Sequence, residues 1–184
     1  ATPELADEAH RHLRRSLAAR WGALGENLRI LYGGSVTADN ARGLAAMPEI
    51  AHFWVLNPDA FACPGACAAI LRQAESTPGY ALMGGRVCYA EPPQRVQIDG
   101  GTVNLWTGVS GNVNLGRPVA EAALPKGEDL DFITGASMIA SRGFYEAVGP
   151  MREDYFLYYE EADWALRRGA MPLVVAEGLV VYHH

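Results

Sequence analysis

An acidic and aromatic segment, Glu153–Trp164, holds the densest group of side chains that could do chemistry. Its sequence, EDYFLYYEEADW, carries five carboxylates within eleven residues. On a helix, Glu160 and Asp163 share one face, and Glu161 points about 100° away from them. Like charges crowded beside apolar rings raise the pKa of at least one carboxyl group, which is how a general base is tuned. The alternative is an acidic helix start that complements the helix dipole.

Asp59 is a candidate metal ligand in the turn Asn57-Pro58-Asp59, which follows the hydrophobic stretch FWVL. Ligands of open parallel sheets bind at the carboxyl ends of strands, and divalent cations such as Mg²⁺ prefer oxygen ligands. The same tripeptide is also an ordinary turn and helix-start signal. His183 and His184 follow another apolar stretch, and a neutral imidazole is a common metal ligand. The alternative for this pair is a disordered end or the remnant of a tag.

A glycine turn at Gly33-Gly34-Ser35 is a candidate phosphate site. It follows the predicted strand LRILY and leads into a predicted helix. Backbone N–H groups at such a junction are left unpaired and suit a phosphate group. The alternative is a plain turn between two elements.

The elements that must position these residues alternate between helix and strand in the first third of the chain. Thr2-Pro3-Glu4 is a typical helix start, and Leu5, Leu13 and Trp21 belong to an apolar stripe along that helix. This alternation predicts an α/β fold with a mainly parallel sheet and flanking helices. Helices are predicted at Thr2–Trp21, Thr37–Met47, Pro64–Glu75, Ser141–Gly149 and Tyr158–Arg168, and strands at Leu28–Tyr32, Ala51–Leu56, Tyr80–Tyr89, Arg95–Ile98, Val103–Trp106, Phe132–Ala140, Leu173–Ala176 and Leu179–Tyr182.

Composition excludes several classes of function. The 184 residues include 15 basic and 21 acidic side chains, which give a net charge of −6. An acidic chain is a poor partner for duplex DNA or an anionic membrane, because both need a basic surface, so no nucleic-acid partner is expected. No apolar run approaches the roughly 18 residues of a membrane-spanning helix, and no secretory signal is recognisable, so a cytoplasmic location is expected.

The stretch from residue 1 to about 50 resembles the C-terminal part of triosephosphate isomerase. TPELADEAHRHLRRSLA is similar to a barrel helix of that family, and LRILYGGSV to the next strand and its phosphate-binding loop. TADNARGLAAMPEI is similar to the short helix that follows. The resemblance implies that Gly34 and Ser35 contact phosphate. It also places the family's catalytic Lys, His and Glu on earlier strands, so isomerase activity is not expected.

The stretch from about residue 51 to 184 resembles the second part of a bacterial family 2 glycosyltransferase with the GT-A fold, of the rhamnosyltransferase-like kind. The motifs that carry the resemblance are WVLNPDA, FITGASMIASRGFYEAVGPM, EDYFLYYEEADWALR and VVYHH. The resemblance implies that Asp59 and His183 hold Mg²⁺ or Mn²⁺, and that Glu161 is the general base. It further implies that the acceptor site is lined by Glu160, Asp163, Trp164 and Gly135.

The two resemblances together predict a chimera, joined near Ile50: an isomerase-like helix-strand-helix segment over residues 1–50, and a glycosyltransferase-like part over residues 51–184. The predicted fold is a partial GT-A-like α/β sheet whose first elements come from a (β/α)₈-barrel fragment. The predicted function is metal-dependent inverting transfer of a sugar from a nucleotide sugar to a saccharide acceptor, impaired because the nucleotide-binding unit of the family is missing. The alternatives are an inactive structural product, forming homo-oligomers through exposed sheet edges, and a residual phosphate-binding isomerase fragment.

Overall fold

The computed structural model describes residues 2–27, 30, 43–44, 51–155 and 158–184. The chain divides into two compact units, Ala1–Ala51 and His52–His184. The described part of the second unit is a mixed α/β fold built on a six-stranded sheet. No helix among the described residues is both long and apolar enough to cross a lipid bilayer.

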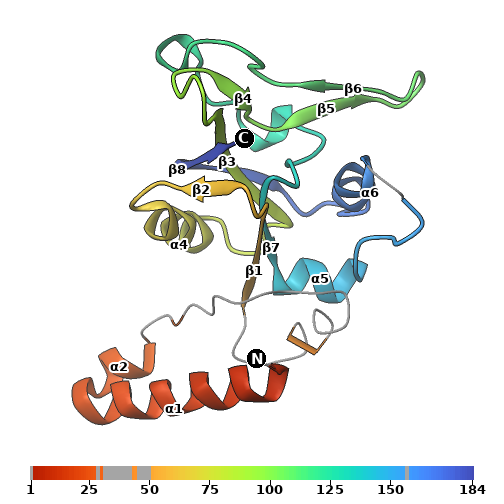
Figure 1. Ribbon diagram of the computed structural model, residues 1–184. Coiled ribbons are helices and arrows are strands. Elements are labelled where there is room, and N and C mark those ends of the chain that lie inside the picture. The colour runs from red at the N-terminus through yellow and green to blue at the C-terminus, as the bar shows by residue number, and fades with distance from the viewer. Residues whose placement is uncertain (1, 28–29, 31–42, 45–50, 156–157) are drawn as a thin grey trace. The chain divides into compact units, whose positions relative to one another are not determined.

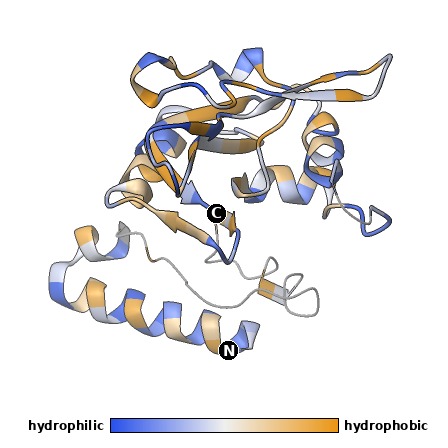
Figure 2. Ribbon diagram, turned by 45° about the horizontal axis from the view of Figure 1, so that its top comes forward, coloured by the Kyte–Doolittle hydropathy of each residue, from blue (hydrophilic) through white to orange (hydrophobic). Residues whose placement is uncertain are grey.

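The first unit begins with a long helix, α1 (Pro3–Trp21), followed by a short one, α2 (Ala23–Asn27). Thr2 caps α1 as predicted, because its hydroxyl accepts a hydrogen bond from the Leu5 N–H at 3.3 Å. Apolar and polar residues alternate along α1 in Figure 2. The predicted apolar stripe is nevertheless largely exposed, with Leu5 at 57% and Trp21 at 50%. The predicted strand Leu28–Tyr32 and helix Thr37–Met47 lie mostly outside the described residues.

The six-stranded sheet of the second unit has the strand order β1-β7-β3-β8-β2, and β4 pairs with one end of β3 (Figure 1). Its strands are β1 (His52–Leu56), β2 (Ala60–Ala62), β3 (Leu82–Tyr89), β4 (Val96–Ile98), β7 (Ser137–Ser141) and β8 (Leu173–His183). A separate hairpin is formed by β5 (Gly101–Asn104) and β6 (Val109–Asn112). Helices α4 (Ala66–Ser76), α5 (Arg142–Val148) and α6 (Glu160–Leu166) and two 3₁₀ turns, η1 (Val119–Glu121) and η2 (Gly127–Asp129), complete the unit.

The prediction of a mainly parallel sheet is wrong for the described residues. In this sheet only β3 and β8 pair in parallel, whereas β1–β7, β2–β8, β3–β4 and β3–β7 are antiparallel. The alternation of helix and strand suggested parallel crossovers. Strand β7, however, follows a long loop-rich stretch in the sequence and runs antiparallel to β3. The GT-A-like assignment therefore stays a proposal. Strands β1 and β2 lie at the outer ends of the strand order, and the predicted association through sheet edges is untested.

Two apolar clusters pack on opposite faces of the sheet, as expected for strands with a residue period of two. Leu82 and Met83 are neighbours on β3, yet Leu82 packs with Phe144 and Trp164, while Met83 packs with Ile70 of α4. Helix α4 thus covers one face, and α5 and α6 contribute to the other (Figure 1).

Two glycines interrupt the predicted strand Tyr80–Tyr89, but β3 runs through both of them. A Cβ at Gly84 would lie 2.7 Å from the Ile133 side chain, and one at Gly85 would lie 2.2 Å from the Leu179 carbonyl oxygen. The glycines are therefore needed because neighbouring segments pack directly on the backbone of β3. Other predictions differ in their ends or in number. The strand predicted at Phe132–Ala140 begins at Ser137, and the two strands predicted in Leu173–Tyr182 are one strand, β8. Strands β2 and β6 were not predicted.

Candidate functional site

Asp59 lies in the short turn between β1 and β2. The Ala60 N–H donates to the Asn57 carbonyl oxygen at 3.1 Å, which closes the turn, and the Asn57 N–H donates to the Ala136 carbonyl oxygen at 3.2 Å. The turn holds Asp59 Oδ1 at 3.2 Å from Nε2 of His183, which stands at the end of β8. Asp59 and His183 thus lie in contact, although they are 124 positions apart in the chain. The sequence predicted both as ligands of one metal.

The imidazole of His183 is oriented from both of its nitrogens. Its Nδ1 lies 2.7 Å from Oε1 of Gln97 on β4, and its Nε2 lies 3.1 Å from Nδ2 of Asn57. A carbonyl oxygen only accepts, so the contact with Gln97 places the ring proton on Nδ1. Nε2 then accepts a hydrogen bond from Nδ2 of Asn57, with Oδ1 of Asp59 lying beside it. A metal-binding histidine commonly donates its other N–H to a carbonyl or carboxylate, and Gln97 fills this role here.

The Asp59–His183 pair fits a divalent cation that binds few protein ligands. One carboxylate beside one imidazole nitrogen suits Mn²⁺, which would take the place of the Asn57 N–H at Nε2, and the carboxylate suits Mg²⁺. Among the described residues no group of three or more His, Cys, Asp or Glu side chains could hold a metal. A cation here would therefore complete its coordination with water and substrate oxygens, as Mg²⁺ does beside phosphates. The predicted metal stays a prediction.

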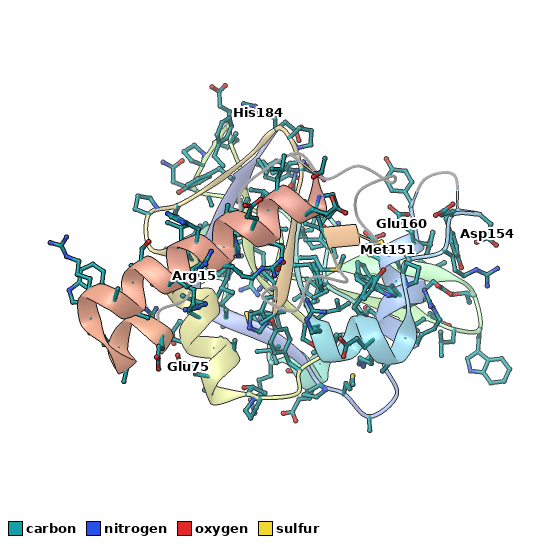
Figure 3. The ribbon with its side chains drawn as sticks, turned by 90° about the horizontal axis from the view of Figure 1, so that it is seen from below. Arg15, Glu75, Met151, Asp154, Glu160 and His184 are labelled. Carbon is teal, nitrogen blue, oxygen red and sulfur yellow. The ribbon has the colours of Figure 1, made fainter. Side chains whose placement is uncertain are left out.

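Glu161 lies in the first turn of α6. Glu160, labelled in Figure 3, is the first residue of this helix. The Gly135 N–H donates to the Glu161 carboxylate. Burial raises the pKa of Glu161 above its ordinary value of 4.5, and the neighbouring charge of Glu160 raises it further. One oxygen of each carboxylate, Oε2, is buried with no hydrogen-bond partner among the described residues. This is the raised carboxyl pKa that the acidic segment predicts.

The Asp59–His183 pair and the Glu160–Glu161 pair lie at the same end of the sheet. Leu56, the last residue of β1, is paired with Ser137, the first residue of β7. Gly135 and Ala136 immediately precede β7; Gly135 contacts Glu161, while Ala136 accepts the hydrogen bond from Asn57. Asn57 in turn contacts His183. A continuous chain of contacts therefore links Asp59 and His183 to Glu161, although the two groups do not touch directly.

The other predicted acceptor residues differ in their surroundings. Asp163 forms an ion pair with Arg167 on the same helix, with 2.9 Å between Oδ2 and Nε. Trp164 is 4% exposed, packs against Phe144 in the core, and donates from its indole nitrogen to the Gly149 carbonyl oxygen at 2.8 Å. Trp164 thus supports α6 from inside the fold. Its predicted contact with an acceptor is untested, as is that of Asp163.

Gly34 and Ser35, the predicted phosphate-contacting residues, lie outside the described residues. Two side chains at the site were not singled out as functional in the sequence. Asn57 stood in the predicted turn only as a turn former, and Gln97 lay in a short predicted strand with no neighbouring motif. Gln97 reaches His183 only through the pairing of β4 with β3 and of β3 with β8, which no local pattern reveals.

The beginning of the chain is similar to proteins of known family. Residues 1–56 match the family model of triosephosphate isomerase. The triosephosphate isomerase of Nitrosomonas europaea is 52% identical over 50 residues, which are 27% of this chain and 20% of the relative. That of Shewanella amazonensis is 54% identical over 50 residues, which are 27% and 19% of the two chains. The chain thus spans about a fifth of the length of these relatives.

The predicted isomerase resemblance is confirmed for this segment of the chain. The match ends at Leu56, the last residue of β1, and so includes a strand of the second unit. In a (β/α)₈ barrel all strands are parallel, whereas β1 pairs antiparallel with β7. The glycosyltransferase resemblance of residues 51–184 rests on its motifs and stays a prediction.

Proposed function

We propose that residues 1–56 form a phosphate-binding segment of the triosephosphate isomerase type and do not catalyse the isomerisation. The family match over these residues supports the phosphate-binding role. Gly34 and Ser35 stand in the stretch YGGSV, where the resemblance assigns phosphate contacts. Isomerisation needs a base to remove a proton from carbon, and the resemblance places that base on isomerase strands outside the matching stretch.

This proposal is tested by titrating the chain with inorganic phosphate and by a coupled assay with glyceraldehyde 3-phosphate. We expect phosphate binding that is weakened in Ser35→Ala, with no turnover above background. Ser16→Ala, an exposed position on α1, is the matched control and should bind phosphate normally. Turnover that disappears in Ser35→Ala would show that the segment retains isomerase chemistry.

For the unit His52–His184 we propose metal-dependent, inverting sugar transfer from a nucleotide sugar to a saccharide hydroxyl. The observation that carries this proposal is the contact between Asp59 and His183, with the imidazole oriented by Gln97. The raised pKa of Glu161, at the same end of the sheet, gives further support. A bound Mg²⁺ or Mn²⁺ would neutralise charge on the diphosphate leaving group.

The chain's own residues would carry the proton and the positioning. Glu161 accepts the proton of the acceptor hydroxyl as the new bond from that oxygen to the sugar carbon forms and the bond from the carbon to the diphosphate oxygen breaks. Gly135 lies beside the Glu161 carboxylate, and its N–H would hold that carboxylate in place. We propose weak donor binding by this chain, because residues 1–56 match triosephosphate isomerase rather than a unit for the nucleotide base.

Calorimetric titration with Mn²⁺, alone and with UDP- and dTDP-sugars, tests this proposal. We expect Mn²⁺ binding that is lost in Asp59→Ala and weakened in His183→Ala. Glu177→Ala removes an exposed carboxylate from the same strand as His183 and is the matched control. Mn²⁺ binding that is equal in all three variants would contradict the site, and tight donor binding would contradict the predicted impairment.

A further inference from the structure

The hairpin of β5 and β6 presents an exposed apolar tip on an uncharged background. Trp106 is 98% exposed and Leu105 is 74% exposed, and every residue of β6 is exposed. Residues 101–112, GTVNLWTGVSGN, contain no charged side chain. In Figure 1 the hairpin extends from the sheet on the side where α6 lies. A nearly fully exposed Trp is costly to leave in water and commonly marks a recognition surface.

Tyr159 ties this hairpin to the start of α6. Its hydroxyl donates to the Gly108 carbonyl oxygen at 2.9 Å and lies 3.4 Å from the Ser110 hydroxyl. Its own carbonyl oxygen accepts a hydrogen bond from the Asp163 N–H at 2.8 Å, in the first turn of α6. Tyr158 and Tyr159 both have a positive φ, 66° and 70°, which non-glycine residues rarely adopt. The next residues in the chain are Glu160 and Glu161, so the hairpin is joined to the carboxylate pair through one side chain.

The chemistry of this surface fits a neutral saccharide. The C–H face of a sugar ring is apolar and packs on the electron-rich face of an aromatic ring, while its hydroxyls exchange hydrogen bonds with uncharged polar groups. The hairpin offers Trp106 for the first contact and Thr107, Ser110 and Asn112 for the second. It has no Lys or Arg for a phosphate or an anionic lipid headgroup, and the nearby carboxylates would repel both.

We propose that the hairpin tip and the Tyr158–Tyr159 pair bind the chain of a neutral saccharide acceptor, whose terminal hydroxyl extends to Glu161. The inference deepens the proposed sugar transfer and rests on it for the role of Glu161. Tyr159 is a positioning residue in this arrangement, because it acts on the carboxylate only by fixing the hairpin relative to α6.

The test is calorimetric titration of the full chain with neutral hexasaccharides built from glucose, mannose, xylose and N-acetylglucosamine, without metal or donor. At least one should bind in the millimolar range or tighter, and Trp106→Ala should weaken it by about tenfold, the loss of one stacked ring. Trp21→Ala, at a half-exposed Trp on α1, is the matched control and should leave binding unchanged. Tyr159→Phe keeps the ring and loses the hydroxyl link, so it should weaken binding by less than Trp106→Ala does.

Three outcomes would overturn this inference: no hexasaccharide binds; binding does not depend on Trp106; or Trp106 instead governs sedimentation with phosphatidylcholine vesicles or self-association of the chain. The titration does not involve Asp59 or a metal. A negative saccharide titration therefore does not affect the conclusion from the Mn²⁺ experiment. A negative Mn²⁺ experiment contradicts sugar transfer but does not affect saccharide binding by the hairpin.

Discussion

The carboxyl group of Glu161 makes stability depend on pH in a definite direction. Its pKa is raised in the folded chain above the ordinary value of 4.5, so the folded state binds more protons than the unfolded state just above that value. Stability therefore falls as pH rises from the unfolded pKa through the folded one. Glu161→Gln should unfold like the parent chain below pH 4 and at a higher temperature at pH 7.

The expected stabilisation of Glu161→Gln at pH 7 is below about 1 kcal/mol, because the group is only partly buried. Thermal unfolding followed by circular dichroism from pH 4 to pH 8 measures it. Glu153→Gln, at an exposed position in the same segment, is the matched control. If the difference between Glu161→Gln and the parent were independent of pH, ionisation of Glu161 would not be its cause.

A buried ion pair, Arg86 with Asp99, fixes the loop-rich stretch to the sheet. Arg86 donates to both carboxylate oxygens of Asp99, at 3.0 Å from Nε and 2.7 Å from Nη2, and to the Ala122 carbonyl oxygen at 2.6 Å. Asn114 donates to Asp99 from the other side at 2.8 Å. Asp99 is 1% exposed, so its removal leaves a buried guanidinium without its counter-charge.

Asp99→Ala should therefore lower the free energy of unfolding by about 3–5 kcal/mol in urea denaturation. The pair Arg142–Glu146, in which Glu146 is exposed, supplies the comparison, because Glu146→Ala should cost less than about 1 kcal/mol. Equal effects of the two substitutions would mean that the Asp99 network contributes no more than a surface pair. The sequence did not indicate this network, since its four residues are spread over 36 positions and none belongs to a local motif.

At the scale of elements, local signals were sufficient for the starts of α1 and α5 and insufficient for strand direction. Thr2 and Ser141 were predicted as caps, and each accepts the expected N–H, at 3.3 Å from Leu5 and 3.1 Å from Phe144. Strand direction depends on which segments meet after the chain has folded, and β7 joins the sheet through contacts with β1 and β3 that are distant in sequence. Residue spacing could not predict that Asp59 lies beside His183. The resemblance predicted this, because it assigned both residues to one metal site.

The two helix caps differ in burial, and this difference yields a prediction. The Ser141 hydroxyl is buried, caps α5 and also donates to the Tyr80 carbonyl oxygen at 2.6 Å, whereas Thr2 is exposed. Ser141→Ala should cost about 2–3 kcal/mol of unfolding free energy, because it removes both the helix cap and a buried hydrogen bond. Thr2→Ala should cost about 1 kcal/mol or less of α1 helix stability. Urea denaturation measures the first substitution and far-ultraviolet circular dichroism the second; a Ser141→Ala cost no larger than that of Thr2→Ala would contradict this role.

At the scale of the whole molecule, the end of the family match and the boundary of the units fall at different residues. The match to triosephosphate isomerase runs to Leu56, whereas the second unit begins at His52. Strand β1 lies between these limits. It pairs with β7 over five residue pairs, and Phe53 and Trp54 pack against the two core clusters of the second unit. The described members of both clusters lie at or beyond residue 53.

Two truncations that differ by β1 decide which limit is the physical one. The fragment 52–184 keeps every described core residue of the second unit and should unfold cooperatively, within a few degrees of the matching transition in the full chain. The fragment 57–184 loses β1 and leaves β7, whose five residues are buried in the full chain, as an edge strand. Losing two packed aromatic rings and one edge of the sheet costs several kcal/mol, a large share of the 5–15 kcal/mol typical of a domain. We therefore expect no cooperative calorimetric transition for 57–184. Cooperative unfolding of both fragments would show that β1 is dispensable and that the unit begins where the isomerase match ends.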